Sequence, residues 1–157
     1  MKEQNSRRFL YASLAWTTGV FVLTAFHHYY GSVLYGTPWR AHVIFIGGIT
    51  LLLCFALVWL YRLYSRHLLL NGYLLIALVI FGLLIGLVEG FYNHTIKDLL
   101  YFSGMNMSTW RSLFPAPAYE VPDNLLFESS GILQFPIGVG QLYSLYRVRK
   151  IYKKSND

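Results

Sequence analysis

Four apolar runs, each about as long as a membrane-spanning helix, most strongly constrain what this chain can fold into. They cover about residues 9–26, 43–60, 68–88 and 125–146. A helix that crosses the hydrocarbon core of a bilayer needs roughly 20 mostly apolar residues. Only 13% of the residues are charged, whereas a typical soluble domain has about 25%. We therefore expect an all-α integral membrane protein.

The runs and their flanking residues predict a single transmembrane domain that uses the whole chain, 1–157. We expect an up-down four-helix bundle, with helices at about 9–28, 38–61, 68–90 and 124–148. A structured outer loop is expected between the third and fourth helices. It would contain an interfacial helix at about 95–102 with Lys97 and Asp98 on its water-facing side.

The distribution of basic residues predicts the orientation of this bundle. Ten of the 13 Lys and Arg residues precede the first helix, lie between the second and third, or follow the fourth. Short cytoplasmic loops are enriched in Lys and Arg. We therefore expect both termini to be cytoplasmic, in a plasma or inner membrane. The basic C-terminal tail is typical of attraction to anionic membrane lipids rather than to nucleic acid.

Each predicted helix carries ionisable residues near its outer end. The first helix ends at His27 and His28, and His42 lies one turn inside the second. Glu89 closes the third, and Glu128 lies one turn inside the fourth. In an up-down bundle these four ends meet. Ionisable side chains are costly to bury at membrane depth, so their convergence predicts a functional site.

Imidazole nitrogens and carboxylate oxygens together suit a divalent transition metal such as zinc, iron or copper. The candidate metal ligands are His27, His28, His42, Glu89, His94 and Glu128. On an unbroken α-helix, Glu89 and His94 would point about 140° apart. His94 could then join the site only if Gly90 broke the helix.

The same residues also allow acid–base chemistry without a metal. A carboxyl group partly removed from water holds its proton more tightly, and a neighbouring histidine can accept one. For either chemistry the candidate catalytic residues are Glu89, Glu128 and His42. The candidate substrate-binding residues are Arg40 and Asn93, because the forked donors of an arginine can hold an anionic head group. Residues 114–122 are expected to cover the pocket.

Two classes of function follow from these features. One is a membrane enzyme that acts on a lipid-soluble or interfacial substrate, with or without a metal. The alternative is a non-catalytic subunit of a larger membrane complex, or a protein that binds or transports a lipid or small molecule. In either class, the expected partners of the protein are membrane lipids and either another membrane subunit or a second copy of this chain. A single-chain transporter is less favoured, because transporters normally carry polar groups near mid-membrane.

Overall fold

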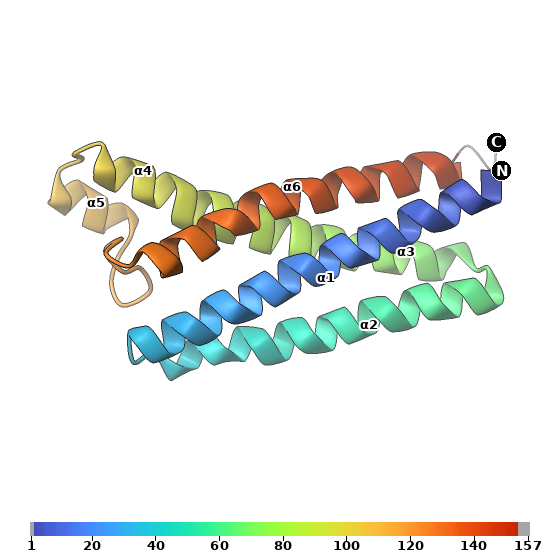
Figure 1. The fold of residues 1–157 in the computed structure, drawn as a ribbon, viewed down its shortest axis with the longest axis horizontal. Coiled ribbons are helices and arrows are strands. Elements are labelled where there is room, and N and C mark those ends of the chain that lie inside the picture. The colour runs from blue at the N-terminus through green and yellow to red at the C-terminus, as the bar shows by residue number, and fades with distance from the viewer. Residues whose placement is uncertain (1, 154–157) are drawn as a thin grey trace.

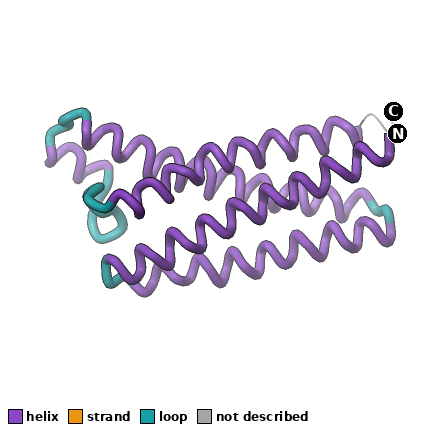
Figure 2. Tube along the Cα trace, viewed as in Figure 1, coloured by secondary structure: helices purple, strands orange, loops and turns teal. Residues whose placement is uncertain are grey.

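The computed structural model describes residues 2–153, and within this range the chain is helical and contains no strand. Four long helical rods run alternately up and down, so that α1 begins and α6 ends at the same end of the molecule (Figure 1). Short loops join the rods at the two ends (Figure 2). The helical elements are α1 (Lys2–Leu34), η1 (Pro38–Ala41), α2 (His42–Tyr64), α3 (His67–Ile76), η2 (Ala77–Ile96), α4 (Lys97–Phe102), α5 (Met107–Leu113) and α6 (Leu125–Lys153).

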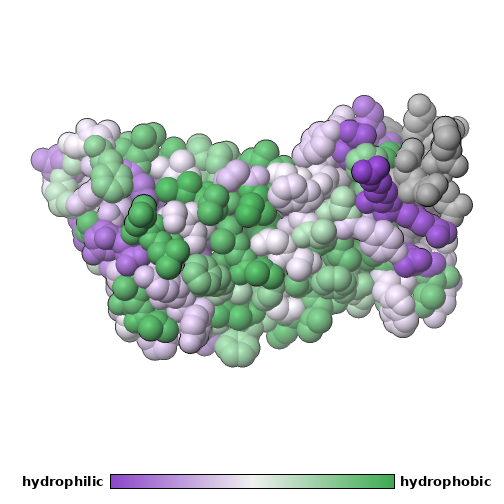
Figure 3. Space-filling view, in the orientation of Figure 1, coloured by the Kyte–Doolittle hydropathy of each residue, from purple (hydrophilic) through white to green (hydrophobic). Residues whose placement is uncertain are grey.

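Three helical stretches among the described residues are long and apolar enough to cross a membrane. They are Arg7–Leu34, Pro38–Tyr64 and His67–Phe102. Hydrophobic residues cover the middle of the face drawn in Figure 3, and hydrophilic residues gather toward its two ends. This pattern is that of a membrane protein, and it supports the sequence prediction for three of the four expected crossings.

The fourth predicted crossing corresponds to α6, which is long but does not belong to this apolar set. Polar residues within its membrane-length part are buried inside the protein; they are Glu128, Ser130, Gln134, Gln141 and Ser144. They lower the average hydropathy of the helix, although the large exposed side chains beside them, such as Leu133 and Val139, are apolar. A fourth crossing and the sidedness of the bundle stay predictions.

Helix α6 packs along both α1 and η2. The two helices approach closely at two glycines, where a Cβ added to Gly86 would lie 3.0 Å from the Cα of Gly138. Small residues at this position allow two helix backbones to touch. Gly86 belongs to a series of glycines at four-residue spacing, Gly82, Gly86 and Gly90, a pattern that favours close helix packing. The contact holds α6 against η2 on the way to the histidines.

The third rod differs from its prediction in both length and winding. The expected helix end near residue 90 is absent, and the rod continues without interruption through α4 as a stretch of 36 residues, His67–Phe102. Over η2 the winding is that of a π-helix, in which each N–H bonds the carbonyl five residues earlier. The Thr95 hydroxyl also donates to the carbonyl five residues earlier, that of Gly90, at 2.9 Å. Residues five apart therefore lie on roughly the same face.

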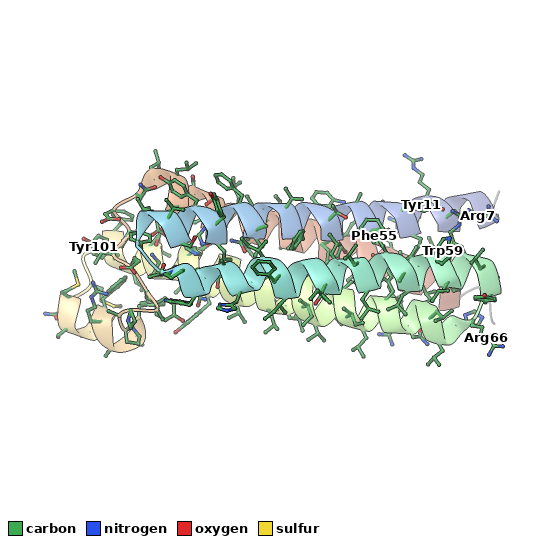
Figure 4. All side chains as sticks on the ribbon, turned by 90° about the horizontal axis from the view of Figure 1, so that it is seen from below. Arg7, Tyr11, Phe55, Trp59, Arg66 and Tyr101 are labelled. Carbon is green, nitrogen blue, oxygen red and sulfur yellow. The ribbon has the colours of Figure 1, made fainter. Side chains whose placement is uncertain are left out.

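The segment predicted as an interfacial helix is the last part of this rod, and its two charged residues are buried. Lys97 and Asp98 are only 2% and 5% exposed, in contrast to the water-facing position expected for them. The reason is that α5 and the following loop fold back over the rod, and the indole N–H of buried Trp110 donates to the Lys97 carbonyl at 3.1 Å. Figure 4 shows Tyr101 near this end of the molecule and Arg7 and Arg66 at the opposite end.

Candidate metal centre

Three imidazole rings surround one carboxylate oxygen at the end of the bundle away from the termini. From Glu89 Oε1, the Nε2 atoms lie at 3.5 Å for His28, 3.6 Å for His94 and 3.9 Å for His27. His27, Glu89 and His94 each offer one ligand atom, and these atoms all lie within 4.8 Å of one another. The cluster is therefore formed by the C-terminal part of α1 and the C-terminal part of η2.

His27 is completely buried and has one ring nitrogen to spare. Its Nδ1 lies 3.0 Å from the hydroxyl of Ser130, and its ring stacks on Phe127 with centroids 4.2 Å apart. Its Nε2 is buried and has no hydrogen-bond partner among the described residues. Leaving a buried polar atom unsatisfied costs about 1–3 kcal/mol. A metal ion bound to Nε2 would remove that cost.

His94 reaches the cluster because of the wide winding of η2. It lies five residues after Glu89, a separation that π-helical bonding places on nearly the same face. Its Nδ1 lies 2.8 Å from Glu128 Oε2, which leaves Nε2 directed toward Glu89. A carboxylate on the far nitrogen of an imidazole is the usual partner of a metal-binding histidine, because it fixes the tautomer and the ring orientation.

The ring of His94 fits only because α6 has a glycine beside it. A Cβ added to Gly131 would collide with the imidazole. Gly131 therefore provides space for the ring, and Glu128 on the preceding turn of the same helix holds it in place. Glu128 lies behind His94 in this arrangement, as a partner of the ring rather than as one of the groups that surround the Glu89 oxygen.

The second oxygen of Glu89 is held by a chain of hydrogen bonds that reaches the loop before α6. Asn93 Nδ2 donates to Glu89 Oε2 at 2.7 Å, and Tyr119 donates its hydroxyl proton to Asn93 Oδ1 at 3.1 Å. Partial burial raises the pKa of the Tyr119 phenol, so the phenol stays a donor at neutral pH. The chain turns Oε1 of Glu89 toward the three imidazoles.

Lys97 is buried on the other side of Glu128. Its Nζ lies 3.0 Å from Glu128 Oε1 and 3.0 Å from Asp98 Oδ1, and it donates to the Glu120 carbonyl at 3.2 Å. Sequence reasoning did not include Lys97 or Asp98 in the site. A signal was present, because residues three and four apart on a helix lie on the same side, and Lys97 and Asp98 follow His94 at those spacings.

The charges in this connected network do not balance among the side chains alone. Arg40 Nη2 lies 3.4 Å from Glu120 Oε1, and Lys97 pairs with Glu128 and Asp98. With Glu89 the network has four carboxylates against two cations, Arg40 and Lys97. With neutral histidines the net charge is therefore −2. One divalent cation would neutralise it.

A cavity of about 190 Å³ opens beside the cluster. Its polar lining includes His28, Arg40, Asn93, Lys97 and Tyr119. The loop predicted to cover the site contributes the wall formed by residues 118–120. Since a water molecule occupies roughly 30 Å³ in the liquid, the cavity can hold several waters or a small polar head group.

The structure thus brings together most of the residues singled out from sequence and leaves one apart. Around the cavity or in direct contact with its lining are His27, His28, Arg40, Glu89, Asn93, His94 and Glu128. His42 is exposed at the first turn of α2, and its Nδ1 lies 2.8 Å from the Trp39 carbonyl. The tight turn of η1 directs this ring back onto its own backbone instead of into the bundle.

In comparisons with known proteins, no family model, no curated protein and no solved structure matches this chain.

Proposed function

We propose that this protein is an integral membrane metalloenzyme that holds one divalent transition metal between α1 and η2. The observation that carries the proposal is the convergence of three imidazole Nε2 atoms on Glu89 Oε1 at 3.5–3.9 Å. In a tetrahedral zinc site with bonds of about 2.0 Å, ligand atoms lie roughly 3.3 Å apart. The ligand atoms of His27, Glu89 and His94 already lie within 4.8 Å of one another, and His28, 3.5 Å from Glu89, is the candidate for the fourth ligand.

The donor set accepts more than one ion. Three imidazoles and a carboxylate suit zinc, ferrous iron and copper. Zinc is the first to test, because four nitrogen and oxygen ligands match its preferred tetrahedral coordination. A metal at this position would act as a Lewis acid and lower the pKa of a water molecule bound to it.

The residues around the cavity suggest what the substrate presents to the metal. Arg40 is buried, and its Nε has no hydrogen-bond partner among the described residues. Both contacts of its Nη2, to Glu120 Oε1 and to the Ala118 carbonyl, are long at 3.4 Å. A guanidinium held this loosely can bind an anionic group. We infer an interfacial substrate with a small anionic head that enters the cavity next to the metal.

The proposed active site would face the extracytoplasmic side. The basic residues that flank the spans lie at the opposite end of the bundle, as Figure 4 shows for Arg7 and Arg66, and the positive-inside rule would place that end in the cytoplasm. This sidedness assumes that α6 is the fourth crossing, with its polar residues turned toward α1 and η2.

The decisive experiment is metal analysis of the full-length protein purified in detergent. After chelation and reloading with zinc, wild-type protein should hold about one ion per chain, the stoichiometry of a mononuclear site. His94→Ala should hold little. His67→Ala is the matched control, because His67 is an exposed histidine at the start of α3, at the far end of the bundle. Equal zinc content in His94→Ala and His67→Ala would rule out the centre.

Acid–base catalysis without a metal is the second candidate. It is favoured by the direct contact of 2.8 Å between the His94 and Glu128 side chains, which could pass a proton between them. One measurement distinguishes the metal-dependent from the metal-free mechanism. Enzymatic activity that persists after a chelator has removed the metal supports the metal-free mechanism. If the protein is instead a non-catalytic subunit, a stoichiometric partner should co-purify with it.

A further inference from the structure

We propose that the groove between α4 and α6 binds an amphiphile made of a hydrocarbon chain and a hydroxyl head, such as a long-chain or isoprenoid alcohol. The hydroxyl would donate a hydrogen bond to Asp98. This groove lies on the opposite side of Glu128 from the metal centre.

The groove has the size and lining of a binding site for an apolar chain. Its volume is about 570 Å³, within the usual range of small-molecule sites, roughly 300–1,000 Å³. Its apolar wall is formed by Leu99, Phe102, Pro122, Leu125 and Ile132. Leu99 and Phe102 are exposed on the side of a stretch that is apolar enough to cross a membrane. A hydrocarbon chain could therefore enter sideways from the bilayer.

Polar side chains line the rest of this groove: the three acids Asp98, Asp123 and Glu128, together with Thr95, Asn124 and Ser129. Asp98 and Glu128 both line it, and both are more than nine-tenths buried. Lys97 Nζ lies 3.0 Å from Asp98 Oδ1, but Oδ1 accepts no hydrogen bond of good geometry from the described residues. An unsatisfied buried carboxylate oxygen is costly. This oxygen is closed to solvent, so a donor on a bound ligand would satisfy it once the Asp98 carboxylate turns toward the groove.

The charges nearby select a neutral donor. An anionic head would meet the three carboxylates of Asp98, Asp123 and Glu128, and the short contacts of Lys97 to Asp98 and Glu128 show that its charge is already engaged. An ammonium head would compete with Lys97 for the same oxygens. A hydroxyl avoids both repulsions and can still donate to an ionised acceptor, where hydrogen bonds are stronger than between neutral groups.

A layer of side chains separates this groove from the polar cavity. Glu128 and Asp98 line the groove, whereas His94 and Lys97 line the cavity. The contacts of Glu128 with His94 at 2.8 Å and with Lys97 at 3.0 Å close the space between them. The two sites therefore share this layer as a common wall, and variants that leave Asp98 and Glu128 unchanged test them separately.

The test uses full-length protein in phosphatidylcholine nanodiscs and a long-chain alcohol with a diazirine in its chain. The matching methyl ether, which has no donor, is the control probe. Labelling of peptides 95–102 and 122–132 is measured by mass spectrometry, with unlabelled dodecanol as competitor. We expect the alcohol to label at least about tenfold more than the ether, the effect of one hydrogen bond to a charged acceptor.

Two protein variants check the location. Ile132→Trp should fill the groove and remove most labelling, whereas Leu133→Trp, one residue further on and exposed, should label like wild type. Asp98→Asn should lower labelling by the alcohol more than labelling by the ether. The tryptophan pair does not alter Asp98, so it gives a result even if Asp98→Asn fails to fold.

Labelling that persists after removal of metal, with the alcohol preference intact, supports the groove site whether or not the metal centre exists. Equal labelling by the alcohol and the ether would contradict the proposal, because it would show that the groove contacts lipid chains without recognising a hydroxyl head. Wild-type labelling of Ile132→Trp would place the probe elsewhere. A second polypeptide bound at these peptides in native mass spectra would overturn the proposal in favour of a subunit interface.

Discussion

Both ends of the bundle carry many charged residues, but these residues are exposed at one end and buried at the other. At the end that holds the termini, the charged side chains lie at the surface beside aromatic rings. Arg62 lies over Tyr11 at 5.4 Å, and Arg147 lies over Phe9 at 4.5 Å. At the other end, Lys97 and Asp98 are buried and pair with each other and with Glu128.

This difference shows which charged residues can be given a function. Exposed charges are stabilised by water or by lipid head groups, and pairs between them contribute little. Buried charges must be balanced inside the protein, since desolvation is expensive. With its histidines neutral, the network at the buried end has two more negative than positive charges, which is why we propose a cation there and not at the termini.

The strongest test of this comparison removes one lysine from each end. Lys97→Met would leave Glu128 and Asp98 without their buried partner, and we expect the free energy of unfolding to fall by about 3–5 kcal/mol. Lys150→Met, at the exposed end, should change it by less than about 0.5 kcal/mol. Denaturant unfolding in detergent measures both. Similar losses in the two variants would mean that the ends do not differ as described.

A second test compares two histidines that the sequence analysis both predicted as metal ligands. His28 faces Glu89 at 3.5 Å, whereas His42 is exposed. His28→Ala should weaken zinc binding at least as much as the roughly 10–100-fold typical of losing an outer partner of a ligand. His42→Ala should leave affinity within about twofold, because an exposed side chain makes no contact with the centre. Competition with a fluorescent chelator gives both values. A loss of zinc affinity in His42→Ala as large as that in His28→Ala would return His42 to the set of ligands.

The smallest expected effect concerns the hydrogen-bond chain that holds Glu89. Tyr119→Phe removes the donor to Asn93, a bond worth about 0.5–1.5 kcal/mol. Zinc affinity should therefore fall by a few-fold while the zinc content at saturation is unchanged. Tyr146→Phe, at the exposed end, is the control. The same titration measures both, and an unchanged affinity in Tyr119→Phe would show that Asn93 does not need the loop to orient Glu89.

Much of the helical framework could be predicted, because it depends on local properties. Apolar runs of bilayer length become helices since a spanning segment must satisfy its own backbone hydrogen bonds. The spacing of Gly86 within its glycine series predicts close helix packing, and Gly138 on α6 meets it. The placement of His27, His28 and Glu89 near one end also follows from helix order alone.

Two parts of the site could not be predicted from local rules. α-Helical geometry turns His94 away from Glu89, and the π-winding of η2 brings it back. Lys97 and Asp98 have the pattern of a water-facing surface, yet α5 and α6 cover them.

The sequence by itself was sufficient to predict the apolar, membrane-type helices and the end of the bundle at which ionisable groups gather. Hydropathy predicts the helices, and the order of residues along the chain predicts that end. Only the tertiary structure decided which of those groups meet. Their meeting depends on Gly131 making room for the His94 ring and on Glu128 holding it from another helix. Such contacts join residues far apart in the chain, and no local pattern encodes them.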